Sequence, residues 1–533
     1  MARRFNTTGP CRPEWHYMVP AVPRLPEIKH HIEKSDYFVV HAPRQTGKTT
    51  TLIETAKELT ASGNYVALHF SCEAGEAAQD DYEAAELMVI EAIRHKADLN
   101  LPQDLQPPPM PQVAAGKRLG HLLSAWARAC PRPLVLFFDE IDALRGQSLL
   151  SVLRQLRDGF LDRPKGYPAS IVLCGLRDVR DYKAAAGGGS KDASAADTKL
   201  GTASPFNIKV ASMKLGNFDK NAVENLYLQH TAETGQVFAP EAIERAFELT
   251  QGQPWLVNAL GYEITETMRV PITETITVGH IEQAKERLIL ARATHIDSLV
   301  SKLREDRVKR ILEPVLAGQM LMLDAAYDDD ALYLRDMGLI ARTNPIAIAN
   351  DIYKEVIVRV LTGMPEANIV IEPHSFILPD GRLNMQRLLD EFTEFWCQHG
   401  DILANHLTYH EAAPQLVFMA FLQRVVNGGG FIDREYGIGR GRIDLLVRWP
   451  FKDAQGIRAV QREAIEMKVW RDKAKDPLAE GLKQIDQYLV KTNLDTGVLI
   501  IFDRRKNAKA IEKRVKFKAE KTPMGKKITL LRA

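Results

Sequence analysis

The sequence predicts an α/β protein whose first part is a parallel sheet covered by helices. Buried strands are indicated at 37–42, 65–70, 134–138 and 170–174, with helix-forming stretches between them. This alternation is typical of a parallel sheet with helices on its faces. A second mixed region of strands and helices follows residue 385, so the 533 residues predict several domains.

The composition places the chain among soluble globular proteins, with 45% hydrophobic and 26% charged residues. No apolar run approaches the roughly 18 residues that a membrane helix needs. The N-terminus lacks the continuous apolar stretch of a secretory signal. The five cysteines are scattered, without the spacing of a zinc site or a disulfide framework. We therefore expect a cytoplasmic protein with no membrane partner.

The chain is predicted to divide into six segments. These are a leader, an α/β core, a helical segment, a second helical segment, a linker and a C-terminal domain, at 1–25, 26–210, 211–275, 276–362, 363–385 and 386–533. Within the second helical segment, Ala331–Leu361 predicts helix, two short strands joined through Asn344-Pro345, and helix. That is the outline of a winged helix, which either binds DNA or serves as a packing module.

The segment that follows the first strand matches the phosphate-binding pattern GxxxxGK[ST], except that Ala42 replaces the first glycine. Gly47 lets backbone N–H groups converge on phosphates, Lys48 reaches the terminal phosphates, and the Thr49 hydroxyl binds Mg²⁺. The strand and helix on either side are in the required order. The sequence therefore predicts an ATP site formed by Pro43, Arg44, Gln45, Thr46, Gly47, Lys48, Thr49 and Thr50.

The strand at 134–138 ends in two acids, Asp139 and Glu140. Asp139 would hold Mg²⁺ through water, and Glu140 would polarise the attacking water as a general base. The alternative is a buried strand capped by two exposed acids. Together with the phosphate loop, the acids predict an ATPase.

With these motifs, residues 1–362 resemble the AAA-like and STAND ATPases. Three more segments support the resemblance: Gly175–Asp178, Ser204–Ile208 and Gln251–Trp255. The resemblance implies a P-loop NTPase sheet, a helical lid over 211–275, a winged-helix segment and a homo-oligomer. It also implies that Pro254 lies near the nucleotide base, and that Arg177 or Arg180 acts as a sensor or arginine finger. A lone arginine after a strand is otherwise a surface ion-pair partner.

A second set of charged residues lies in two predicted strands of the C-terminal domain. The strand 441–447 carries Asp444, and the strand 463–470 carries Glu466 and Lys468 on one face, because alternate residues of a strand share a face. Two acids would bind Mg²⁺, and the lysine would stabilise an attacking hydroxide. The alternative is an exposed cross-strand ion pair.

These residues resemble the PD-(D/E)XK nuclease superfamily, with Asp444 as first acid and Glu466-x-Lys468 as second motif, 22 residues apart. The resemblance implies a restriction-endonuclease-like α/β domain. It makes Glu411, Asp444 and Glu466 ligands of Mg²⁺ or Mn²⁺. It also assigns Gln484 and Tyr488 to a Q-x-x-x-Y element on one helix face.

The combined prediction is an ATP-regulated, Mg²⁺-dependent nuclease that acts on nucleic acid, with DNA as the expected partner. By family analogy it serves genome or anti-phage defence in bacteria. Residues 503–533 carry 12 Lys or Arg against 3 Asp or Glu, which is either a phosphate-backbone footprint or a solvated basic surface. The alternatives are a DNA-binding ATPase with a silent nuclease-like domain and an ATP-driven oligomeric signalling scaffold.

Overall fold

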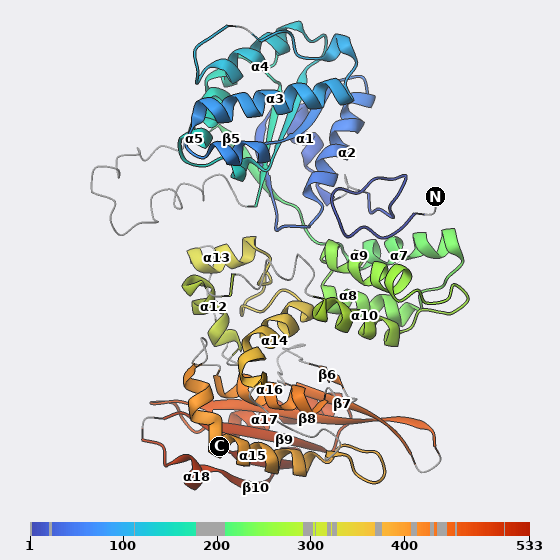
Figure 1. The fold of residues 1–533 in the computed structure, drawn as a ribbon, viewed down its shortest axis with the longest axis vertical. Coiled ribbons are helices and arrows are strands. Elements are labelled where there is room, and N and C mark those ends of the chain that lie inside the picture. The colour runs from blue at the N-terminus through green and yellow to red at the C-terminus, as the bar shows by residue number, and fades with distance from the viewer. Residues whose placement is uncertain are drawn as a thin grey trace. The chain divides into compact units, whose positions relative to one another are not determined.

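The chain forms two compact units in the computed structural model (Figure 1). The N-terminal unit comprises Met1–Leu288 and Asp336–Gly338, and the C-terminal unit comprises Ile289–Arg335 and Leu339–Ala533. The structure describes residues 3–20, 24–110, 112–176, 208–291, 302–303, 305–316, 321, 328–367, 376–406, 413–426, 431–433, 445–453, 456–505 and 507–533.

The N-terminal unit is built on a five-stranded sheet in the order β2-β3-β4-β1-β5, with every neighbouring pair parallel. Its strands are β1 (Tyr37–His41), β2 (Val66–Ser71), β3 (Leu134–Asp139), β4 (Ser170–Gly175) and β5 (Lys209–Lys214). The first four agree with the predicted strands to within one residue at each end. The predicted parallel sheet is confirmed, whereas β5 had no clear signal in the sequence.

Helices cover both faces of this sheet. They are α1 (Ile28–Glu33), α2 (Lys48–Ala61), α3 (Tyr82–Asn100), α4 (Arg118–Ala129) and α5 (Gly146–Asp158), with the 3-10 turns η2 (Glu73–Ala78), η3 (Gln103–Leu105), η4 (Ile141–Ala143) and η5 (Gly159–Asp162). Tyr37 and Val39 of β1 join the hydrophobic cluster with α3, α4 and α5, and Phe38 and Val40 join the cluster with α1 and α2. Burial on both faces explains the uninterrupted apolar strands.

Four helices, here called the lid, follow β5: α7 (Lys220–Thr234), α8 (Pro240–Thr250), α9 (Pro254–Tyr262) and α10 (Val278–Leu290), with a π-turn η7 (Glu263–Thr267) after α9. Helices α8 and α9 each begin with proline in the first turn, where its missing N–H costs no hydrogen bond. Residues 211–214, expected in the lid, belong to β5.

The expected leader is an integral part of the N-terminal unit. Phe5 is fully buried, and its ring contacts Tyr17 of the leader and Tyr227, His230 and Phe238 of the lid region. Tyr17 Oη also lies 3.2 Å from His230 Nδ1. The leader is therefore fixed on the lid by an aromatic cluster.

The C-terminal unit begins with α12 (Asp306–Leu316), α13 (Asp329–Asp336) and α14 (Asp351–Ala367). Between α13 and α14, Ile340 and Ile348 form one antiparallel bridge on either side of Asn344-Pro345. Helix, paired segment and helix thus follow in the predicted order. Because α14 continues to Ala367, the linker prediction is wrong for residues 363–367. Gly363 and Pro365 suggested a break, but both lie inside the helix.

A six-stranded mixed sheet completes this unit, in the order β10-β11-β9-β8-β7-β6. Strands β8, β9 and β11 are parallel, and the other pairs are antiparallel. The strands are β6 (Phe431–Asp433), β7 (Leu445–Lys452), β8 (Arg458–Trp470), β9 (Thr496–Asp503), β10 (Lys516–Lys521) and β11 (Lys527–Arg532). The helices are α15 (Met385–His406), α16 (Ala413–Val426), α17 (Leu478–Lys491) and α18 (Ile511–Arg514).

Aromatic residues of α15 and α16 pack against one face of this sheet, with Phe392 and Trp396 in contact with Phe502. On the other face, α17 contributes Ile485 and Leu489 to a separate hydrophobic cluster. The predicted second α/β region is therefore present.

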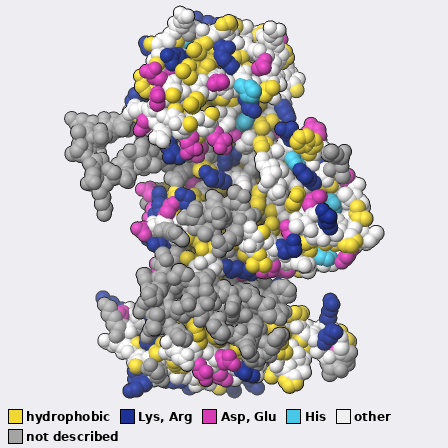
Figure 2. All heavy atoms as spheres, in the orientation of Figure 1, with side chains coloured by type: hydrophobic (Ala, Val, Ile, Leu, Met, Phe, Trp, Pro, Cys, Tyr) yellow, Lys and Arg dark blue, Asp and Glu magenta, His cyan; other side chains and the backbone are white. Residues whose placement is uncertain are grey.

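The surface of the described residues carries both signs of charge. On the face shown in Figure 2, acidic and basic side chains are interspersed over the N-terminal unit. Lys516, Lys518 and Lys521 are exposed on β10, which is an edge strand of the second sheet. Among the described residues, no helix has the length and apolar composition needed to span a membrane.

Candidate nucleotide site and a second acid–lysine pair

The predicted phosphate loop connects β1 to the first turn of α2. Gly47 precedes the helix with φ 84°, and Gln45 has φ 59°, so the loop uses two left-handed residues to turn into the helix. Only glycine adopts such an angle without strain. The loop therefore directs backbone N–H groups toward the N-terminus of α2, where an anion is favoured.

Lys48 folds back over the loop. Its Nζ donates to the carbonyl oxygens of Ala42 and Pro43, both at 2.8 Å. Thr46 Oγ1 donates to the same Pro43 carbonyl at 2.9 Å. These bonds hold the loop in a closed shape and keep the ammonium group over it.

The hydroxyl of Thr49, in the first turn of α2, meets the carboxylate of Asp139, the last residue of β3. Thr49 Oγ1 donates to Asp139 Oδ2 at 2.7 Å, and His69 Nε2 lies 3.0 Å from the same oxygen. Burial alone would raise the pKa of Asp139, but the hydrogen bonds from His69 and Thr49 and the charge of His69 lower it overall. A hydroxyl beside an ionised carboxylate is a pair of oxygen ligands suited to Mg²⁺.

Glu140 directly follows β3 and has φ 54°. Ser71 Oγ, at the end of β2, donates to Glu140 Oε2 at 2.5 Å. Burial raises the pKa of Glu140; the Ser71 hydrogen bond lowers it and the nearby Asp139 charge raises it again, and the net change is upward. Glu140 is therefore held on β2 rather than pointed at the loop.

The lid contacts the loop through the predicted Gln-Gly-Gln-Pro segment. Gly252 has φ 67°, and Gln253 caps α9 by accepting from Leu256 N at 2.6 Å. Gln253 Nε2 also approaches the carbonyl of Gln45 at 3.4 Å. Pro254, which is buried, forms the first turn of α9. The role of Pro254 near a nucleotide base stays a prediction, and Arg177 and Arg180 lie outside the described residues.

Sequence reasoning missed several residues of this site. The Cys11 backbone N–H donates to Thr50 Oγ1 at 3.0 Å, and Arg24 donates to the Thr46 carbonyl at 2.8 Å. Neither has a local sequence signal, because the leader reaches the loop only by tertiary contact. His69 and Ser71 did have a signal, since both are polar residues near the end of a buried strand.

In the C-terminal unit, β8 and α17 bring together three of the predicted residues. Glu466 is fully buried on β8, and Lys468 Nζ lies 3.0 Å from Glu466 Oε1. Lys468 also donates to Gln484 Oε1 on α17, and Gln484 Nε2 donates to Glu480 Oε1 at 3.1 Å. Tyr488, one turn further along α17, is buried in the apolar cluster.

The remaining predicted residues of this second site, Asp444 and Glu411, lie outside the described residues. Strand β7 begins at Leu445, which pairs with Ile465 next to Glu466. Within the part of the chain that the structure describes, no group of three or more His, Cys, Asp or Glu side chains could hold a metal ion. Glu466 is thus the one predicted nuclease-site ligand whose surroundings are known.

No family model matches the sequence, and no curated protein matches it. Among solved structures, a Walker-type ATPase of Pyrococcus abyssi is similar, with TM-score 0.45 and 14% identity over 66% of this chain and 99% of that one. The RuvB Holliday junction branch migration motor of Thermotoga maritima has TM-score 0.34 and 15% identity, over 63% of this chain and 92% of that one. Domain III of the replication initiation protein DnaA of Thermotoga maritima has TM-score 0.30 and 11% identity, over 52% and 98%.

All three TM-scores lie below 0.5, so the assignment of the N-terminal unit rests on its own geometry. A parallel sheet whose first strand leads through a glycine-containing phosphate loop into a helix is the P-loop fold. The N-terminal unit therefore has a P-loop α/β fold.

Proposed function

We propose that the N-terminal unit binds ATP with Mg²⁺ and hydrolyses it. The observation that carries this proposal is the 2.7 Å hydrogen bond between Thr49 Oγ1 and Asp139 Oδ2, beside the loop lysine. This bond places the Thr49 hydroxyl at the N-terminus of α2 beside the buried carboxylate that ends β3. Both groups are oxygen ligands of the kind that Mg²⁺ binds.

Each residue has a role in this proposal. The triphosphate lies against the loop N–H groups and the N-terminus of α2, and Lys48 exchanges its carbonyl contacts for phosphate oxygens. Thr49 and Asp139 would hold Mg²⁺, which would supply positive charge against the phosphates. Glu140 leaves Ser71, orients the attacking water and accepts its proton. Water attack breaks the terminal phosphoanhydride bond and releases ADP and phosphate.

The resemblance to AAA-like ATPases adds further proposals for the same site. Gln253 and Pro254 would change position when nucleotide binds, because Gln253 already contacts the loop at Gln45. Arg177 or Arg180 would sense the terminal phosphate, in the same subunit or in a neighbouring one of a homo-oligomer.

The direct test is phosphate release from ATP by the full-length protein, with Mg²⁺ or with a chelator. We expect turnover that needs Mg²⁺ and that Lys48→Ala abolishes. The matched control is Lys57→Ala, which removes an exposed lysine of the same helix that pairs with Glu54. Mg²⁺-dependent turnover that survives in Lys48→Ala would contradict the proposal.

We further propose that the C-terminal unit is a metal-dependent nuclease under the control of ATP. The supporting observation is the convergence of Glu466, Lys468 and Gln484 from β8 and α17. Glu466, together with Asp444 and Glu411, would bind Mg²⁺ or Mn²⁺, and Lys468 would stabilise the attacking hydroxide. DNA is the proposed substrate, and the proposed defence role depends on family resemblance alone.

This second proposal is tested by incubating the protein with linear DNA, circular DNA and RNA, with Mg²⁺ or Mn²⁺, in the presence and absence of ATP. Lys468→Ala should stop cleavage, whereas Lys483→Ala, an exposed lysine on α17, should not. Binding without cleavage by the wild-type protein would favour a silent DNA anchor. Absence of salt-dependent binding would favour a signalling scaffold.

A further inference from the structure

Arg24 is a half-buried cation placed against the phosphate loop. Its Nη2 donates to the Thr46 carbonyl at 2.8 Å and to the Gly216 carbonyl at 2.6 Å. Its guanidinium carbon lies 4.8 Å from the centre of the Phe218 ring, within the range of a cation–π contact. One side chain of the leader thus joins the loop to the segment that enters the lid.

The described part of the chain places no carboxylate beside the charge of Arg24. Among the described residues the guanidinium has no carboxylate partner, and its Nε is buried without a hydrogen-bond acceptor. Burial lowers the pKa of Arg24 to about 10, so the side chain stays charged at neutral pH. A cation that is partly removed from water without a neighbouring anion is costly, which favours a bound anion beside it.

The third nitrogen of the guanidinium faces the loop. A Cβ placed on Gly47 would meet Arg24 Nη1 at 3.0 Å. Gly47 is the residue at which the loop turns into α2, so Arg24 lies directly behind the backbone that would hold the phosphates. The hydrogen bond from Arg24 also satisfies the Thr46 carbonyl oxygen of the loop.

We propose that Arg24 is a positioning residue of the nucleotide site, which holds the loop in its anion-binding shape and supplies a second positive charge behind it. The inference rests on the proposed ATP binding and deepens it. A fixed charge of this kind favours ligands in proportion to their negative charge, because its field acts on each phosphate. ATP should therefore depend on Arg24 more than ADP does, and ADP more than AMP.

The test compares Arg24→Gln and Arg24→Lys with a matched control, Arg163→Gln. Arg163 is also half-buried, stacks on Phe160 at 3.4 Å and donates to the Ser35 carbonyl at 2.8 Å. Ser35 precedes β1 whereas the loop follows it, so this control loses a similar arginine at the other end of the strand, away from the proposed site.

Affinities for AMP, ADP and ATP are measured by calorimetry on the full-length protein, and KM and kcat by phosphate release. For Arg24→Gln we expect at least about tenfold weaker ATP binding, a smaller loss for ADP and the smallest for AMP. KM should rise more than kcat falls, and Arg24→Lys should recover part of the ATP affinity. Arg163→Gln should retain wild-type affinities.

Equal losses for the three nucleotides in Arg24→Gln, or no loss, would overturn the inference while leaving the proposed ATP site intact. Failure of the wild-type protein to bind ATP would overturn both. To separate a folding defect from a loop defect, amide hydrogen exchange is followed without nucleotide. Faster exchange in 42–48 alone supports the inference, and faster exchange throughout the sheet contradicts it.

Discussion

The two candidate sites use the same residue types in opposite ways. In the N-terminal site, Lys48 binds backbone carbonyls while Asp139 binds Thr49 and His69, so the acid and the lysine do not neutralise each other. In the C-terminal site, Lys468 lies 3.0 Å from the buried Glu466. The first arrangement leaves both charges for a ligand, whereas the second is an ion pair that also contributes to stability.

The largest expected effect tests whether the N-terminal site is catalytic. Glu140→Gln should lower ATP turnover by about 100-fold or more, because a general base typically contributes 10²–10⁴-fold. ATP affinity should persist, since Glu140 contacts Ser71 and not the loop. Rapid-quench turnover and calorimetric binding measure the two quantities. Asp142→Asn, a nearby acid in η4, is the control, and equal losses in both variants would remove Glu140 from its proposed role.

The second prediction tests whether the C-terminal ion pair stabilises the fold. Lys468→Ala should lower the free energy of unfolding by about 3 kcal/mol, because it leaves Glu466 buried without its cation. Lys48→Ala should cost much less, since only bonds to loop carbonyls are lost. Urea unfolding of both variants and of Lys483→Ala provides the measurement. If the two main variants are equally stable, the proposed contrast between the sites is wrong.

The same contrast explains how much the sequence could predict. The phosphate loop is contiguous in sequence, and β3 ends in adjacent acids. Strand order and local motifs were therefore enough to predict the site residues Lys48, Thr49, Asp139 and Glu140. The pairing of Glu466 with Lys468 followed from strand alternation. The burial of Glu466 did not, because it depends on α17 and on neighbouring strands that pair over long sequence separations.

Residues that reach a site from elsewhere in the chain were the ones missed. Arg24 lies in the segment predicted as a leader, and its partners Thr46 and Gly216 are distant in sequence. The linker error at residues 363–367 has a different origin, because the backbone of α14 continues through Gly363 and Pro365 despite their local preference for a break. Residues of contiguous motifs could therefore be predicted from the sequence, whereas residues that reach a site through tertiary contacts could not.

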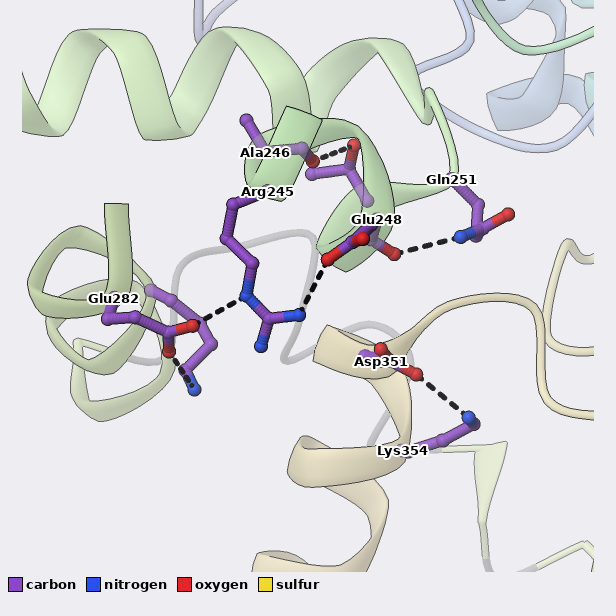
Figure 3. A network of polar contacts seen from close by, with 9 residues as sticks. Arg245, Ala246, Glu248, Gln251, Glu282, Asp351 and Lys354 are labelled. Carbon is purple, nitrogen blue, oxygen red and sulfur yellow. Dashed lines mark hydrogen bonds and ion pairs between the residues drawn. The ribbon is translucent and has the colours of Figure 1, made fainter. Parts of the chain in front are cut away.

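A second buried acid–lysine pair, in the lid, serves as a reference for the C-terminal pair. Glu282 accepts from Arg245 Nε at 2.7 Å (Figure 3). It also accepts from Lys285 Nζ at 2.8 Å. Figure 3 also shows Lys354 with Asp351, a pair within the first turn of α14. Burial alone would raise the pKa of Glu282. The charges and hydrogen bonds of Lys285 and Arg245 outweigh burial and lower this pKa from 4.5 to about 2.

A depressed carboxyl pKa stabilises the fold above the unfolded pKa, and the contribution is lost as pH falls. For Glu282 the loss should occur between pH 4.5 and about 2 and amount to about 3 kcal/mol. Glu282→Gln should therefore be less stable than wild type at pH 7 and approach it below about pH 2. Thermal unfolding across this range measures the difference. A constant difference at all pH values would show that lost packing, rather than charge, is responsible.

The smallest expected effect concerns the hydrogen bond that restrains Glu140. Ser71→Ala removes a bond worth about 1 kcal/mol, so kcat at pH 8 should rise by no more than about fivefold as Glu140 becomes free to reach the water. The Ser71 bond also lowers the pKa of Glu140, so its removal should raise that pKa and move the acidic limb of the kcat profile to higher pH. Ser62→Ala, at the end of α2, is the control. An unchanged profile in Ser71→Ala would mean that Glu140 is not the group that titrates during turnover, and Glu140→Gln would then need another explanation for its loss of activity.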